Sequence, residues 1–287
     1  MGLHDQRMAL MWIQNNIFAF GGNSNSITLF GESSGAASVG LHLLSSGDDE
    51  LFQRAILQSG SPLAYWATMT KPQARQRLKR FLKKVNCQDD HTILNCLNQI
   101  PAEVIVKAQQ DLSSVQLGHF TWVPVVDHQL ILNNPRIMLS NLQMKRSNIL
   151  LGSSKNEGSR WMVYLLHFLK HKAPFTLTSN ELHSLIDKVF YELSEPARSK
   201  IKKFYFDLQH KKTNSKYNRD LYQIILEDRH MFCPMLDFAK AFSVSGTTVL
   251  CTDYNTVQKT KIGQSGWVWY MDLIYRYCID FQIDRPH

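Results

Sequence analysis

Apolar and polar positions in the first part of the chain alternate between a helical period and short β-prone runs. This order of elements predicts an α/β protein with a mostly parallel sheet. The predicted elements are a helix at residues 5–17, a strand at 26–30, a helix at 34–44 and a strand at 55–58. The first helix is expected to bury an apolar face formed by Met8, Met11, Trp12 and Ile13.

Beyond residue 70 the periodicity is mostly helical. Thr178 and Glu181 have the spacing of a capping box that opens a helix, with apolar residues following at helical intervals. Short apolar runs predict further strands at residues 123–126, 148–152 and 247–250. The pattern of residues after Cys251 predicts no clear helix or strand.

The composition is typical of a folded protein. The chain has 287 residues, of which 44% are hydrophobic and 20% charged, enough for one large core or two small ones. No apolar run approaches the roughly 20 residues of a membrane span. The N-terminus lacks the apolar segment and cleavage site of a signal peptide.

The formal net charge of +8 comes largely from two basic runs. Helices with this spacing usually present a solvated basic face, whereas a nucleic-acid groove would need aromatic residues among the charges. Nucleic acid is therefore not expected as a partner. The runs comprise Arg75, Arg77, Arg80, Lys83 and Lys84, then Arg198, Lys200, Lys202, Lys203, Lys211 and Lys212.

The strongest chemical signal is the segment Gly31-Glu32-Ser33-Ser34-Gly35, between a predicted strand and a predicted helix. In this context a G-x-S-x-G motif forms a nucleophile elbow, a sharp turn that projects the serine hydroxyl above the sheet. The amide of Ser34 and the helix N-terminus would stabilise an oxyanion. The motif also arises by chance, but the strand–turn–helix context favours a hydrolase with Ser33 as nucleophile.

Four segments occur in series: residues 2–10 (GLHDQRMAL), 20–23 (FGGN), 29–39 (LFGESSGAASV) and 55–62 (AILQSGSP). Together they resemble the type-B carboxylesterases, and within them the cholinesterases, most of all the acetylcholinesterases. The similarity is strong over the first 65 residues and patchy from there to about Val249. It implies an α/β-hydrolase fold, with helices flanking the sheet, and hydrolysis of small carboxylic esters through a serine acyl-enzyme.

The resemblance assigns roles around the elbow. Ser33 matches the nucleophile. Residues 152–158 (GSSKNEG) are similar to the segment that supplies the triad carboxylate, so Glu157 is expected to orient the catalytic imidazole. Ser59 matches a serine that helps to hold this carboxylate. From the residues alone, Glu157 would be an ordinary loop glutamate.

The resemblance also implies an acyl and substrate pocket, although from sequence alone its aromatic residues indicate plain core packing. Gly118 stands where acetylcholinesterases carry a bulky aromatic residue, which predicts a roomier acyl pocket. Arg160 stands where an aromatic residue usually faces choline, and a guanidinium there would repel a quaternary ammonium. The expected pocket residues are Trp66, Gly118, Phe120, Trp122, Arg160 and Trp161.

Two of the five cysteines, Cys87 and Cys96, flank a short polar segment. The spacing alone fits a small disulfide loop and two reduced core cysteines about equally. The resemblance implies the disulfide. No Cys/His spacing is typical of a zinc site, and the resemblance implies neither a metal nor an organic cofactor.

The sequence departs from the family pattern at both ends. The family has an N-terminal part with the first sheet strands and the glycine-rich half of the oxyanion hole, and both this part and the C-terminal part are expected to be missing here. The family histidine aligns with Tyr275. We therefore expect residues 1–250 to form a partial α/β-hydrolase domain, residues 251–287 to form a divergent segment, and this chain to be a poor esterase or none.

Two functions stay open. The first is a carboxylic ester hydrolase of cholinesterase type, secreted or at the cell surface. The second is a non-catalytic cholinesterase-like adhesion or binding protein, which Tyr275 and Arg160 favour and which the retained Ser33 and Glu157 oppose. The resemblance leaves oligomerisation of the full-length protein open.

Overall fold

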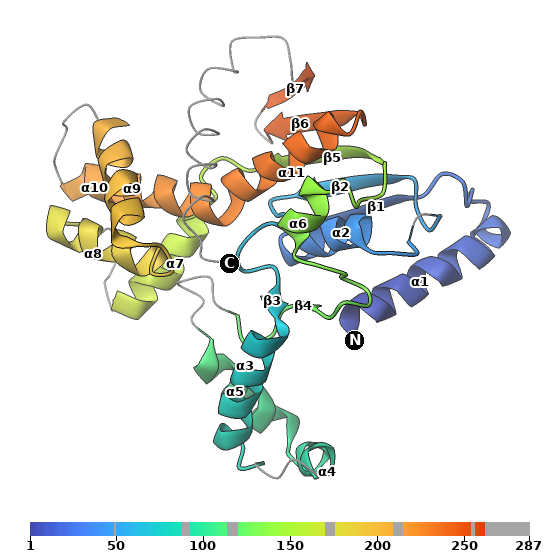
Figure 1. The fold of residues 1–287 in the computed structure, drawn as a ribbon, viewed down its shortest axis with the longest axis horizontal. Coiled ribbons are helices and arrows are strands. Elements are labelled where there is room, and N and C mark those ends of the chain that lie inside the picture. Colours follow the sequence, from blue (N-terminus) through green and yellow to red (C-terminus); the bar gives the residue numbers. More distant parts are fainter. Residues whose placement is uncertain are drawn as a thin grey trace.

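A computed structural model describes residues 1–48, 50–87, 92–113, 120–169, 176–208, 215–253 and 256–261. Their main sheet contains, in spatial order, β1 (Thr28–Glu32), β2 (Arg54–Gln58), β5 (Asn148–Ser153), β6 (Val249–Asp253) and β7 (Thr256–Lys261) (Figure 1). The first four strands run parallel, and β7 pairs antiparallel with β6. The sheet confirms the predicted fold class.

The register of β1, β2 and β5 brings their carboxyl ends to one edge of the sheet. Glu32 pairs with Gln58, and Gln58 pairs with Gly152. The loops that follow these strands therefore leave the sheet side by side. Ligand sites of open parallel sheets lie at this edge, so the register places the predicted site residues where such a site is expected.

Three helices pack together against the sheet: α2 (Ser34–Leu44), α6 (Pro135–Ser140) and α11 (Cys233–Val244) (Figure 1). Eight of the eleven residues of α2 are buried, because this helix is apolar around most of its circumference. The core between helices and sheet is close-packed, with Leu41, Leu57, Leu151 and Phe238 each at most 1% exposed. This core fixes the start of α2 relative to the strand ends.

A second lobe is helical and stands to the left in Figure 1. Its helices are α7 (Gly158–Leu169), α8 (Ser179–Val189), α9 (Glu195–Leu208) and α10 (Ser215–Glu227), with α10 continuing through the π-helical segment η3 (Asp228–Phe232) into α11. The capping box is confirmed, since Glu181 N–H donates to Thr178 Oγ1 at 3.2 Å and Thr178 N–H donates to Glu181 Oε2 at 2.8 Å.

A third lobe lies below the sheet in Figure 1. It contains β3 (Met69–Thr70), α3 (Lys71–Lys84), α4 (Ile93–Asn98), α5 (Ala102–Leu112) and β4 (Val125–Val126). Cys87 and Cys96 are joined by a disulfide, which confirms the pairing that the resemblance implied. Cys87 belongs to a small core with Phe81, Leu82 and Ala108, and Cys96 packs against this core.

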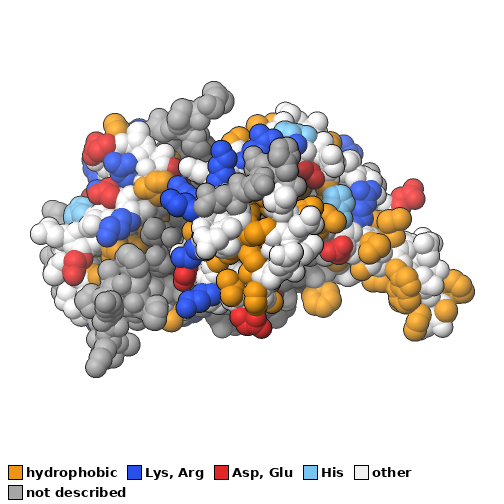
Figure 2. Space-filling model, turned by 90° about the horizontal axis from the view of Figure 1, so that it is seen from below, with side chains coloured by type: hydrophobic (Ala, Val, Ile, Leu, Met, Phe, Trp, Pro, Cys, Tyr) orange, Lys and Arg blue, Asp and Glu red, His pale blue; other side chains and the backbone are white. Residues whose placement is uncertain are grey.

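The expected apolar face of the first helix, α1 (Gly2–Asn16), is wrong. Met8, Met11 and Trp12 are 66%, 50% and 54% exposed, and Leu10 is the buried residue of this helix. The side of α1 that faces the rest of the protein contains polar residues. Arg7 pairs with Asp48, and Gln14 Nε2 donates to two backbone carbonyls, those of Ser24 and Glu50. Hydrophobic side chains consequently gather at the α1 end of the molecule, on the right of Figure 2.

Candidate active site

Ser33 occupies the turn between β1 and α2 in a backbone conformation that L-residues rarely adopt. Its φ is 56° and its ψ is −116°, outside the favoured regions. Ser33 N–H donates to the Gln58 carbonyl at 2.9 Å, and Ala37 N–H donates to the Ser33 carbonyl at 3.0 Å. The strained turn is thus held by β2 on one side and by the first turn of α2 on the other.

Close backbone approach explains two glycines at this turn. A Cβ on Gly31 would lie 2.4 Å from the carbonyl carbon of Gly35, and a Cβ on Gly60 would lie 2.3 Å from the Ser33 carbonyl oxygen. Gly35 differs, because a Cβ there would meet no atom within 4 Å. The first glycine of the motif is therefore required by packing in the folded chain, and the second is not.

Gly31→Ala is expected to lower the free energy of unfolding of the full-length protein by about 3 kcal/mol, because the new methyl overlaps backbone that cannot move without undoing the turn. Gly35→Ala is the matched control, and a small stabilisation of up to about 1 kcal/mol is expected from better helix propensity. Urea denaturation of both variants measures the difference. Equal losses in the two variants would contradict this account.

The amide of Ser34 begins helix α2. The first amides of a helix have no intrahelical acceptor, and no side chain caps this end of α2. The helix N-terminus also carries partial positive charge. The residue after the predicted nucleophile therefore offers a donor for developing negative charge, as an oxyanion hole requires.

Glu157 lies in the loop between β5 and α7, close to the residue that follows β2. Its Oε1 accepts from Ser59 Oγ at 2.5 Å and from Ser154 N–H at 2.8 Å. Ser59 is itself fixed by a bond from its N–H to the Gly152 carbonyl at 2.8 Å. Because both bonds end on Oε1, Oε2 has no partner among the described residues and is open to a further donor.

A cavity of about 320 Å³ opens beside the elbow. Of the predicted site residues, the cavity is lined by Ser33, Ser34, Trp66, Phe120, Trp122, Arg160 and Trp161. Gly118 lies outside the described residues. Ser59 and Glu157 are not part of the lining, so the cavity is bordered by the predicted nucleophile and pocket residues but not by the predicted carboxylate.

Three of the four aromatic residues that line the cavity, Trp66, Phe120 and Trp161, also belong to the core of the helical lobe or pack against it. Trp66 and Trp161 are 6% and 3% exposed. Phe120 lies between them, with ring centroids 6.2 and 6.4 Å away in edge-to-face geometry. Trp161 stacks on His230 at 3.8 Å, and Trp66 Nε1 donates to the His230 carbonyl at 2.9 Å. Core packing and cavity lining are therefore not exclusive alternatives here.

Sequence reasoning missed Arg77, which it placed in a solvated basic face. Arg77 Nη1 instead donates to the carbonyl of Phe120, and burial lowers the pKa of its guanidinium. This contact ties helix α3 to the segment that carries a cavity aromatic. The basic run gave no signal of it, because a half-buried arginine and a solvated one have the same spacing in a helix.

Among the described residues, no histidine side chain contacts the carboxylate of Glu157. His230 is buried and contacts Tyr65 and Trp161. Residues 262–287 lie outside the described residues, and they include Tyr275, which aligns with the family histidine. The alignment at Tyr275 and the domain boundary at residue 250 therefore stay predictions.

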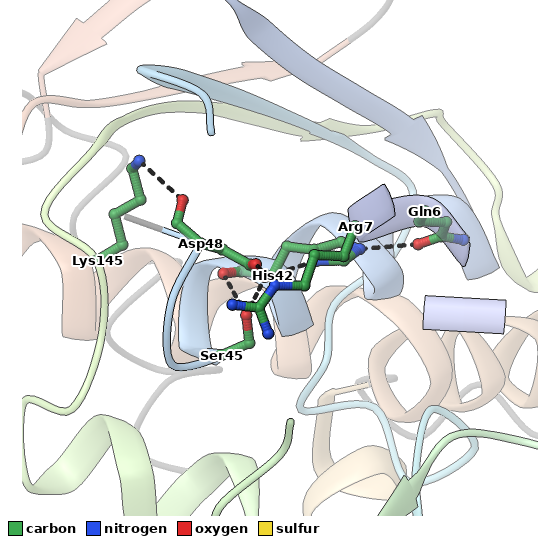
Figure 3. Close-up of polar contacts among 6 residues, drawn as sticks. All are labelled: Gln6, Arg7, His42, Ser45, Asp48 and Lys145. Atoms are coloured by element: carbon green, nitrogen blue, oxygen red, sulfur yellow. Dashed lines mark hydrogen bonds and ion pairs between the residues drawn. The ribbon is translucent and has the colours of Figure 1, made fainter. Parts of the chain in front are cut away.

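A second Ser-His-Asp set lies beneath α1 and has a different arrangement (Figure 3). Asp48 Oδ2 accepts from Ser45 Oγ and lies 2.8 Å from His42 Nδ1, and Asp48 Oδ1 faces Arg7 Nε at 2.9 Å. His42 Nε2 lies 3.0 Å from Gln6 Oε1. The serine therefore bonds to the carboxylate and not to the imidazole. His42, Ser45 and Asp48 are buried, and their contacts with Gln6 and Arg7 join α1 to α2. The set has no activated nucleophile.

The pKa of Asp48 lies below its ordinary value. Burial raises this pKa, but hydrogen bonds from His42 and Ser45 and the charges of His42 and Arg7 lower it by more. Because the folded pKa is depressed, the carboxylate stabilises the fold above the unfolded pKa of about 3.9. That contribution is lost as the pH falls through the folded pKa.

Asp48→Asn is expected to lower the free energy of unfolding of the full-length protein by about 3 kcal/mol at pH 7, because Arg7 loses its carboxylate partner. The gap to the wild type should narrow as the pH drops below about 4. Asp111→Asn removes an exposed ion pair with Lys84 and should cost less than about 1 kcal/mol. Denaturation curves between pH 3 and pH 7 test both. A gap that does not change with pH would contradict this assignment.

The described residues contain no group of three or more His, Cys, Asp or Glu side chains arranged to hold a metal ion. Among the helices of the described part of the chain, none has the length and apolar character to cross a membrane.

The Carboxylesterase family matches residues 1–275 of this chain. Acetylcholinesterase of Bungarus fasciatus is 36% identical over all of this chain and 47% of its own length. Acetylcholinesterase of Danio rerio is 39% identical over 85% of the chain and 39% of its own length.

A third relative, acetylcholinesterase of Myxine glutinosa, is 35% identical over 88% of this chain and 76% of its own length. The chain thus spans less than half the length of the first two relatives. The family match nevertheless covers nearly the whole chain, including the elbow, the carboxylate loop and the cavity residues. The chain belongs to the Carboxylesterase family, with cholinesterase-type relatives.

Proposed function

We propose that the full-length protein hydrolyses carboxylic esters of the cholinesterase type through an acyl-enzyme on Ser33. The observation that carries the proposal is the meeting of three features at one sheet edge. These are the strained elbow at Ser33, the carboxylate of Glu157 held on Oε1 alone, and a cavity lined by Ser33. The names of the acetylcholinesterase relatives support the same reaction class.

The chemistry follows from these groups. Ser33 Oγ attacks the ester carbonyl while a histidine takes its proton, and Glu157 Oε2 accepts the Nδ1–H of that histidine. The Ser34 amide stabilises the tetrahedral oxyanion. The histidine then protonates the leaving alcohol, and water releases the acid from Ser33 by the reverse sequence. The catalytic histidine is itself proposed, because no histidine among the described residues contacts Glu157.

The proposal also includes the location of the protein in the organism. The Cys87–Cys96 disulfide suits an oxidising compartment, and with the acetylcholinesterase relatives it supports a secreted or cell-surface location. A non-catalytic binding protein is the competing function. Its support is that Oε2 of Glu157 contacts no imidazole within the described residues and that Arg160 lines the cavity.

Hydrolysis of 4-nitrophenyl acetate and 4-nitrophenyl butyrate by the full-length protein tests the proposal. Turnover of both esters is expected, with kcat/KM about tenfold or more in favour of butyryl, because the resemblance aligns Gly118 with a bulky aromatic residue of the acetylcholinesterases. Gly118→Phe should reverse the preference. Absence of turnover with either ester would refute the proposed function. A strong acetyl preference that Gly118→Phe leaves unchanged would refute only the acyl-pocket assignment.

A further inference from the structure

One charged side chain occurs among the described residues that line the cavity beside Ser33, and it is Arg160. The other lining residues are aromatic, aliphatic or neutral polar. Arg160 is exposed at the cavity and has no ion-pair or hydrogen-bond partner within the described chain, whereas three arginines that are more buried have carboxylate partners. Those pairs are Arg7 with Asp48, Arg136 with Asp237, and Arg229 with Glu192. An uncompensated positive charge therefore borders the site.

The position of Arg160 in helix α7 does not explain this charge. Arg160 is the third residue of α7, in the first turn. A cation there faces the positive end of the helix dipole, which is unfavourable for the helix. The N-terminus of α2 also contributes its N-cap residue Ser33 and its first residue Ser34 to the lining. Two helix N-termini and one guanidinium thus border the same cavity, and all three favour an anion.

The aromatic rings of the cavity raise the opposite possibility, since Trp66, Phe120 and Trp161 could attract a cation. The rings act through their quadrupole, whose field falls off faster with distance than that of a full charge. A quaternary ammonium in this cavity would also meet Arg160. A flat aromatic acid would use both features, because its ring packs against the aromatics and its carboxylate accepts two hydrogen bonds from the guanidinium.

We propose that this cavity selects esters that carry a carboxylate, with Arg160 binding the carboxylate while Ser33 attacks the ester carbonyl. The inference rests on the proposed ester hydrolysis and names the substrate class. It predicts that the site prefers anionic esters over cationic ones, which is the opposite of the preference that choline esters would require.

A series of three acetate esters that differ in charge tests the proposal in the full-length protein. They are 4-acetoxybenzoate (anionic), methyl 4-acetoxybenzoate (neutral) and 4-acetoxy-N,N,N-trimethylanilinium (cationic). With kcat/KM normalised to each ester's rate with hydroxide, the anion should exceed the cation by tenfold or more. Arg160→Gln should remove about tenfold of this preference, mainly through KM, and Arg160→Lys should retain part of it. Arg75→Gln, which removes an exposed charge on α3, is the matched control and should change nothing.

The outcomes separate the two proposals. If Ser33-dependent hydrolysis occurs with a neutral or cationic preference that Arg160→Gln does not alter, the carboxylate proposal is overturned and the ester hydrolase stands. If none of the three esters is hydrolysed, the proposed function fails. The cavity is then tested without turnover by calorimetric binding of 4-acetamidobenzoate, which mimics the anionic ester. Binding weakened about tenfold by Arg160→Gln supports the carboxylate site, and no binding to the wild type overturns it.

Discussion

Ser33→Ala is expected to lower kcat for 4-nitrophenyl butyrate by about a millionfold in the full-length protein, because removal of a triad nucleophile typically costs this much. The physical reason is that Ser33 Oγ is the atom that forms the acyl-enzyme. The turn places this side chain at the cavity, and alanine keeps the turn while deleting the hydroxyl.

Ser34→Ala is the matched control for this measurement. It removes a neighbouring hydroxyl but keeps the backbone amide that is proposed to stabilise the oxyanion, so kcat should change by less than about tenfold. Steady-state rates of the two variants decide the matter. A Ser33→Ala variant within a hundredfold of the wild type would contradict the assignment of the nucleophile.

Glu157→Gln is expected to lower kcat for the same ester by about ten-thousandfold, the effect seen when a triad carboxylate becomes an amide. The amide oxygen can still accept from Ser59 and Ser154, which both bond to Oε1. The amide nitrogen then replaces Oε2 and presents a donor to the imidazole N–H. The fold is thus retained while the imidazole loses its acceptor.

Glu195→Gln on α9 removes the same charge far from the elbow in sequence and should leave kcat within about twofold. Thermal denaturation should show Glu157→Gln as stable as the wild type to within about 1 kcal/mol. A large loss of stability with little loss of rate would show that Glu157 is a structural residue only.

Local sequence rules predicted much of the fold. The elbow was predictable because a glycine at position 31 and a strand–turn–helix context are both visible in the chain. The capping box at Thr178 was predictable because it depends on residues three apart. Parallel pairing followed from the βαβ order. In each case the deciding interactions are close in sequence or follow from periodicity.

Long-range polar contacts could not be predicted in this way. Met8 and Trp12 are exposed because the side of α1 that carries Arg7 faces Asp48. Apolar periodicity carries no information about that ion pair. Arg77 likewise bonds to Phe120 across 43 residues. The assignment of Glu157 required the family resemblance, because a loop glutamate shows its role only when the fold brings Ser59 to it.

Mapping the adduct of a fluorophosphonate probe in the full-length protein tests the central claim most directly. The hydroxyl of an activated serine displaces fluoride and becomes phosphonylated, so the modified peptide identifies the nucleophile without any assumption about the natural ester. The account predicts one modified site, Ser33, with labelling lost in Ser33→Ala and strongly slowed in Glu157→Gln. Labelling at another serine, or no labelling at Ser33 in folded protein, would contradict it.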